Sequence, residues 1–124
     1  MMHKKESKQT QKLASLFVGR WQPFHKGHKM LLETVLKRGK PVIIAIRNTK
    51  KSSKNPYSVT ERTKMIKTAL TKYAHLMTII TIPDIAEICY GRKVGYAIRK
   101  VRLPVLYEQI SGTNIRRRFS SRKK

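Results

Sequence analysis

Apolar residues occur along this chain in short runs that are separated by polar, basic segments. Residues 13–18 are mostly apolar and stop at Gly19, which is typical of a strand buried on both faces of a sheet. Residues 42–46 and 77–82 show the same pattern, and Pro83 closes the last run. We therefore predict three strands, the first two of them buried.

Two longer segments show the spacing of an amphipathic helix. Residues 27–38 place four apolar side chains on one stripe, and Gly39 followed by Pro41 supplies a stop signal. Ser58 and Glu61 have the spacing of a capping box, so a second helix is expected to begin after Ser58. The first stripe consists of Leu31, Leu32, Val35 and Leu36, and the second of Met65, Ile66, Ala69, Leu70 and Tyr73.

These elements alternate as strand, helix, strand, helix, strand, with short connections. The order predicts right-handed crossovers and an α/β, Rossmann-like fold, a parallel sheet with helices on both faces. In such sheets, ligands bind beyond the carboxyl ends of the strands. The loop after Gly19, residues 47–57 and the segment after Pro83 should therefore share one rim. Residues 85–107 are expected to add a short strand, a helix or both.

The length of 124 residues allows one domain with one apolar core. Residues 1–12 are polar and basic, which predicts a disordered arm; residues 13–119 form the domain and residues 120–124 a basic tail. No apolar stretch approaches the roughly 20 residues that span a bilayer, and the N-terminus lacks the apolar region of a secretory signal. With Cys89 as the single cysteine, we expect a cytoplasmic protein and interpret Cys89 as a small core residue rather than a nucleophile.

The charge of the chain is its strongest compositional signal. There are 29 lysines and arginines against 6 aspartates and glutamates, for a formal net charge of +23. Such a field attracts polyanions: nucleotides, phosphorylated metabolites, nucleic acid or an anionic membrane surface. Much of the charge lies at the two ends, which are interpreted either as solvated tails or as segments that bind nucleic acid. Charge by itself does not choose among these partners.

Residues 19–28, GRWQPFHKGH, carry the clearest chemical pattern, between the first strand and the first helix. A helix N-terminus offers free N–H groups and positive potential, so phosphates bind there. His25 and His28 stand three residues apart on this first turn, and each can donate a hydrogen bond to a phosphate oxygen. Gly27 leaves room for a triphosphate, and Arg20 adds positive charge. The segment therefore predicts a phosphate-binding loop.

The alternatives for the two histidines are structural. His28 precedes Leu31 and Leu32 by one turn and could pack on the core, while His25 could cap the helix. Two histidines around a glycine, after a buried strand and before a helix, favour the functional interpretation. A metal site is the other use of paired histidines, but no third ligand with suitable spacing stands nearby, so we expect no metal held by protein ligands.

A second anion site is predicted near the C-terminus. Ser111 is placed to cap a short helix, Gly112 allows close approach, and Thr113 adds a second hydroxyl. These hydroxyls and the backbone N–H groups would hold β and γ phosphates, and Arg116, one turn on, would neutralise charge. Seen alone, such a capped turn followed by arginine is usually structural. Together with residues 19–28, called the histidine loop below, it indicates a second phosphate site.

Taken together, residues 19–28 and 110–116 resemble the two signatures of the HxGH-type nucleotidyltransferase superfamily, which includes archaeal nicotinamide-mononucleotide adenylyltransferases and small cytidylyltransferases. Residues 55–57 with Glu61 and Arg62 are similar to the archaeal adenylyltransferase pattern before its second helix. The chain departs from that pattern at Trp21, where Phe is usual, and in a shorter segment before residue 110.

The resemblance implies a catalytic set of His25, His28 and Arg116, in which the histidines contact the triphosphate and the arginine binds its distal phosphates. It also implies Mg²⁺ with ATP or CTP as the cofactor. The residues assigned to nucleotide binding are Gly19, Arg20, Trp21, Gln22, Phe24, Gly27, Ser111, Gly112 and Thr113.

We therefore expect a nucleotidyltransferase that moves an adenylyl or cytidylyl group from ATP or CTP to a phosphorylated small-molecule acceptor. An acceptor phosphate oxygen attacks the α-phosphorus in line and pyrophosphate leaves, with no protein nucleophile. A nicotinamide-mononucleotide adenylyltransferase-like reaction is one form of this. Arg47 and Arg62 are interpreted either as phosphate contacts at the rim or as ordinary surface or ion-paired residues.

The alternative hypothesis is a non-catalytic, basic nucleic-acid-binding protein on the same fold. It predicts salt-dependent binding to polynucleotide that survives the loss of both histidines. Against it, the chain shows no aromatic stacking surface or recognition motif beyond its charge. The base, the acceptor and the oligomeric state, including a homo-oligomer, stay open at this stage.

Overall fold

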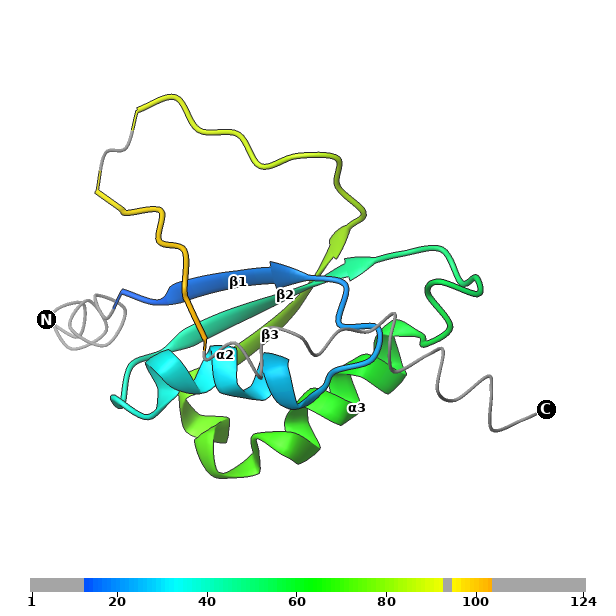
Figure 1. Cartoon of the computed structure of the whole chain (residues 1–124), viewed down its shortest axis with the longest axis horizontal. Coiled ribbons are helices and arrows are strands. Elements are labelled where there is room, and N and C mark those ends of the chain that lie inside the picture. Colours follow the sequence, from blue (N-terminus) through cyan, green and yellow to red (C-terminus); the bar gives the residue numbers. More distant parts are fainter. Residues whose placement is uncertain (1–12, 93–94, 104–124) are drawn as a thin grey trace, which may run out of the picture.

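The computed structural model describes residues 13–92 and 95–103 of the chain (Figure 1). The predicted order of strands and helices is confirmed, with a short 3-10 helix, η1, added before the third strand. The proposed arm over residues 1–12 and the tail over residues 120–124 lie outside the described residues. The elements are β1 (Ser15–Gly19), α2 (Lys26–Leu36), β2 (Val42–Asn48), α3 (Val59–Ala69), η1 (Thr71–Leu76) and β3 (Met77–Pro83).

The three strands form one parallel sheet in the order β1-β2-β3. Ser15 pairs with Val42, and Val42 pairs with Met77, so the strands begin level with one another. Each crossover between neighbouring strands contains a helix, as the alternating pattern predicts. The α/β, Rossmann-like class is therefore confirmed.

The apolar core lies between the sheet and the two helices. Both α2 and α3 lie on the same side of the sheet in Figure 1, and their buried side chains join one cluster with alternate residues of β2. On the opposite face, Leu16 is 60% exposed and Ile80 is 40% exposed. The expected burial of both faces of the first strand is thus wrong at Leu16, because the helices that the structure describes cover one face only. The central members of the cluster are Leu32, Val35, Leu36, Val42, Ile44, Ile46, Ile66 and Leu70.

The helix boundaries follow the predicted local signals. At the start of α3, the Ser58 side chain accepts a hydrogen bond from the Glu61 backbone N–H (3.1 Å), and the Ser58 backbone N–H donates to the Glu61 carboxylate (3.0 Å). These bonds lower the pKa of the Glu61 carboxyl. After α2, Gly39 has a φ of 72°, a left-handed conformation that glycine adopts without a steric cost. The capping box and the stop signal are therefore confirmed.

Residues 84–92 and 95–103 make a wide excursion after β3 and contain no helix or strand (Figure 1). The predicted strand or helix is therefore wrong over this described part of the segment. The interpretation of Cys89 as a core residue is also wrong, because its side chain is exposed on this excursion. Within the described part of the chain, no helix has the length and apolar content to cross a membrane.

Candidate active site

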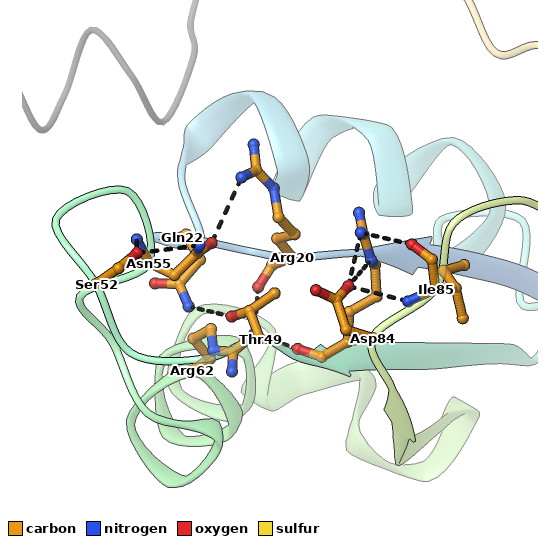
Figure 2. Close-up of polar contacts among 9 residues, drawn as sticks. Arg20, Gln22, Thr49, Ser52, Asn55, Arg62, Asp84 and Ile85 are labelled. Carbon is orange, nitrogen blue, oxygen red and sulfur yellow. Dashed lines mark hydrogen bonds and ion pairs between the residues drawn. The ribbon is translucent and has the colours of Figure 1, made fainter.

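The carboxyl ends of the three strands meet at one edge of the sheet, and polar contacts tie the loops that follow them (Figure 2). Arg62 of α3 lies beneath this rim and is fully buried. Its Nη1 donates to the backbone carbonyls of Arg20 (2.6 Å) and Arg47 (2.8 Å), and its Nε donates to the Ser58 carbonyl (3.1 Å). One guanidinium therefore joins the end of β1, the end of β2 and the start of α3.

Arg62 does not have the ordinary surface or ion-paired role that was one of its two interpretations. Its side chain is neither on the surface nor in an ion pair, so that interpretation is wrong: its hydrogen bonds go to neutral carbonyls, and among the described residues its Nη2 has no hydrogen-bond partner. Burial lowers the pKa of the guanidinium, which stays protonated at neutral pH. The rim is thus built over a buried positive charge.

Gln22 makes a second tie between the loops. Its Nε2 donates to the Thr49 hydroxyl (3.1 Å) and to the Tyr57 carbonyl (2.8 Å), while its Oε1 accepts from the Tyr57 backbone N–H (2.9 Å). Both Gln22 and Thr49 are buried. Farther out, Arg20 Nη1 donates to the side-chain oxygen of Asn55 (3.4 Å). The loop over residues 49–57 is therefore held against the histidine loop at several points (Figure 2).

A third tie connects β2 with the segment after β3. Arg47 forms an ion pair with Asp84, with 2.7 Å between Nη2 and Oδ1, and its Nη2 also donates to the Ile85 carbonyl (3.0 Å). Of the two interpretations of Arg47, the ion-paired one is therefore confirmed. Together the three ties bring the histidine loop, residues 47–57 and the start of the segment after Pro83 to one rim, as the sheet order predicts.

The two histidines form a reciprocal pair at the start of α2. His25 is the N-cap residue, and its Nδ1 accepts a hydrogen bond from the His28 backbone N–H (3.3 Å). In return, Nδ1 of His28 accepts from the His25 backbone N–H (3.2 Å). The rings are stacked, with centroids 3.5 Å apart and 17° between their planes. The capping that the sequence offered as the structural alternative for His25 is thus present, and it holds both rings against the first turn of α2.

These hydrogen bonds determine where each imidazole carries its proton. Because each Nδ1 accepts a hydrogen bond, the proton of the neutral ring lies on Nε2. Burial lowers the pKa of His28 to about 3, with a further contribution from the nearby His25, and burial also lowers the pKa of His25. At neutral pH the pair therefore presents two uncharged Nε2–H donors at a helix N-terminus, a position that favours anions.

A groove with charged side chains lies beside this pair. Lys26 and Lys29, on the first turn of α2, line this open groove of about 520 Å³ between α2 and α3, together with His25 and the acidic Glu33. Among the residues that the structure describes, no group of three histidine, cysteine, aspartate or glutamate side chains gathers to hold a metal ion. The described part of the site thus offers hydrogen-bond donors and cations, which are the groups that bind phosphate.

The remaining residues assigned to nucleotide binding occupy different environments. Arg20 is exposed at the rim, Phe24 is half-buried with its ring centroid 5.6 Å from that of His28, and Gly27 is buried in the first turn of α2. Trp21 is 4% exposed, and its indole lies over Gly19, where an added Cβ would come within 2.9 Å of the indole Cε2. The predicted C-terminal anion site, made of Ser111, Gly112, Thr113 and Arg116, lies outside the described residues.

Sequence reasoning missed the contacts that assemble the rim. It assigned Gln22 to the nucleotide, and it gave no role to Thr49 or Asp84. One signal was available for Arg62: it precedes Ile66 by four residues, so it falls on the buried stripe of α3, where a charged side chain needs internal partners.

Comparison with known proteins agrees with this geometry. Residues 16–82 match the family model described as cytidylyltransferase-like. This match covers β1 through most of β3, including the histidine loop and all of its ties to residues 47–57. The chain belongs to the cytidylyltransferase-like family. It is therefore a nucleotidyltransferase by family.

Individual relatives extend the match beyond the family model. The chain is 32% identical over 136 aligned positions to the nicotinamide-nucleotide adenylyltransferase of Methanococcus aeolicus, covering 86% of this chain and 77% of the relative. The protein of that name from Halobacterium salinarum is 26% identical and covered over 73% of its length. That of Pyrococcus horikoshii is 40% identical over 77 positions but covered over only 41% of its length. The first alignment is longer than this chain, so that relative carries insertions.

Proposed function

We propose that this nucleotidyltransferase transfers the adenylyl group of ATP to nicotinamide mononucleotide and releases pyrophosphate. The observation that carries the proposal is the reciprocal histidine pair, which presents two neutral Nε2–H donors at the N-terminus of α2. The names of the relatives from Methanococcus aeolicus and Halobacterium salinarum support the choice of ATP and of this acceptor.

In the proposed reaction, a phosphate oxygen of the acceptor attacks the α-phosphorus of ATP. A new O–P bond forms as the bond between the α-phosphorus and the bridging oxygen of the β-phosphate breaks, and that oxygen leaves with pyrophosphate. His25 and His28 donate from Nε2 to phosphate oxygens whose negative charge increases in the transition state. The neutral rings keep their protons throughout, so the site supplies positioning and electrostatic stabilisation without a protein nucleophile.

The nucleotide enters as its Mg²⁺ complex, with the metal as part of the substrate. Mg²⁺ commonly binds through substrate phosphates and retains several waters. This fits the described rim, where Asp84 is already paired with Arg47. We further propose that Ser111, Thr113 and Arg116, which lie outside the described residues, complete the site on the distal phosphates.

The test is pyrophosphate release by the full chain with MgATP or MgCTP and a panel of phosphorylated acceptors that includes nicotinamide mononucleotide. We expect turnover with ATP and nicotinamide mononucleotide, the dinucleotide product being identified by mass. His28→Ala should lower kcat by at least about a hundredfold, the typical cost of one lost transition-state donor. His75→Ala, which removes an exposed histidine of η1, is the matched control and should keep the wild-type rate. Full activity of the His28 variant would contradict the role given to His28.

We also propose a second property, non-specific binding of polynucleotides. The excess of 29 lysines and arginines over 6 acidic residues supports it, because neutralising backbone phosphates releases counterions whatever the sequence. This binding requires neither histidine and is compatible with turnover.

A further inference from the structure

Trp21 has an unusual backbone conformation for a residue with a large side chain. Its φ is 54°, in the left-handed region that non-glycine residues rarely adopt. The conformation directs the indole over Gly19, whose lack of a side chain leaves the space that the indole fills. A residue held this way within the proposed phosphate-binding loop indicates a role there, since such strain collects at functional sites.

The indole connects the central strand to the histidine pair. Its Nε1–H donates to the Ala45 carbonyl of β2 (3.1 Å) in a buried hydrogen bond. On its other side, the ring meets His28 in an edge-to-face contact, with centroids 4.8 Å apart and 82° between the planes. Trp21 therefore links a rigid part of the sheet to the ring that donates at the site.

Trp21 adds a restraint on the His28 ring that does not come from α2. The hydrogen bond to its Nδ1 and the stacked His25 ring come from one turn of the same helix, so both move with that turn. Trp21 is anchored separately, through Ala45, and limits the tilt of the His28 ring relative to the sheet. We propose that Trp21 is a positioning residue that sets the direction of the His28 Nε2–H donor. The inference rests on the proposed function of His28.

Two substitutions separate the parts of this contact. Trp21→Phe keeps an aromatic ring and loses the bond to Ala45, while Trp21→Leu loses both. Tyr73→Leu is the matched control, because Tyr73 is a buried aromatic of the same core cluster but belongs to η1. For each variant, kcat and KM for ATP are measured well below its Tm. The ring ¹⁵N and ¹³C signals of His28 are recorded on the protein without nucleotide.

A donor that is displaced affects the transition state more than the bound substrate, so kcat should change more than KM. We expect Trp21→Leu to lower kcat by about tenfold or more while KM for ATP changes less than about threefold, with a smaller loss for Trp21→Phe. Tyr73→Leu should lower Tm comparably and leave kcat within about twofold of wild type. The His28 signals should shift in both Trp21 variants and stay in place in the control.

Equal kcat in Trp21→Leu and Tyr73→Leu, or unchanged His28 signals in both Trp21 variants, would overturn the inference. If Trp21→Leu does not fold, Trp21→Phe carries the same comparison. Failure of the proposed function would look different, because the wild-type protein would then release no pyrophosphate with any acceptor. The His28 signals would still decide whether Trp21 orients the ring.

Discussion

At the residue scale, the two histidines have the structural role that the sequence offered as an alternative, and this role is compatible with the chemical one that we propose. Each Nδ1 caps a backbone N–H at the start of α2, and this same bond leaves the proton on Nε2. Capping thus determines which ring atom can donate to a ligand. Serine and glutamate, which form the box at the start of α3, satisfy the same backbone groups with side-chain oxygens and have no ring N–H.

The low pKa of His28 predicts a pH dependence of stability. Because burial holds this pKa at about 3 against an ordinary value of 6.5, the unfolded chain binds a proton between these values that the folded chain does not. The free energy of unfolding should therefore decrease as the pH falls from 6.5 toward 3, by up to about 1.4 kcal/mol per pH unit. Urea denaturation between pH 6.5 and 4.5, above most carboxyl titration, measures this slope.

His28→Gln removes the titrating group and should flatten that slope, leaving the smaller part that belongs to His25, whose pKa is also lowered by burial. His75→Ala is the comparison, since it removes an exposed histidine of η1. A slope equally steep in the His28 variant would show that another group titrates in this window.

At the element scale, the site depends on how loops from different strands are joined. Helices and strands begin and end on local signals, such as the capping box at Ser58 or the glycine after α2, so their existence was predictable. The ties at the rim join residues up to 42 positions apart, as in the bond from Arg62 to the Arg20 carbonyl. The local sequence pattern does not show which of these distant residues contact one another.

Gln22 is the clearest test of these ties. Replacing it with Met, which is similar in shape, leaves the Tyr57 N–H and carbonyl and the Thr49 hydroxyl without their described partner. We expect a loss of about 2–4 kcal/mol in the free energy of unfolding, from groups that each cost about 1–3 kcal/mol when buried unpaired. Hydrogen exchange at the Tyr57 amide should accelerate as well.

Thr34→Ala is the control for the Gln22 variant. It removes a hydrogen bond from the Thr34 hydroxyl to the Leu31 carbonyl within α2, where the backbone remains helical. The free energy of unfolding should decrease by only about 0.5 kcal/mol, and the Tyr57 amide should exchange at the wild-type rate. If Gln22→Met were equally mild, the tie would have no importance for the rim.

At the scale of the whole molecule, the net charge of +23 acts on every anionic ligand. A field of this sign attracts nucleoside triphosphates and longer polyanions alike. It contributes nothing to the choice between them, which depends on the donors at the rim. The net charge therefore predicts non-specific binding of polyanions, and the donors at the rim predict which ligand is preferred.

Binding to a fluorescent single-stranded oligonucleotide should depend steeply on salt. For about six phosphate contacts with a single strand, affinity should fall roughly 300-fold between about 50 and 200 mM NaCl. Fluorescence anisotropy measures it, and a His25→Ala, His28→Ala double variant should bind as the wild type does. Salt-independent binding, or loss of binding in the double variant, would contradict a purely electrostatic mode.

The sequence by itself determined the fold class and the position of the histidine loop before α2, because apolar periodicity, capping residues and the two histidines around Gly27 are local features. It erred at Leu16 and Cys89, where exposure depends on what the rest of the molecule covers. Only the tertiary structure decided that Arg62 and Gln22 join the loops, and that Trp21 connects β2 with His28. These contacts arise when the parallel strands bring their carboxyl ends to one edge, which sequence spacing does not encode.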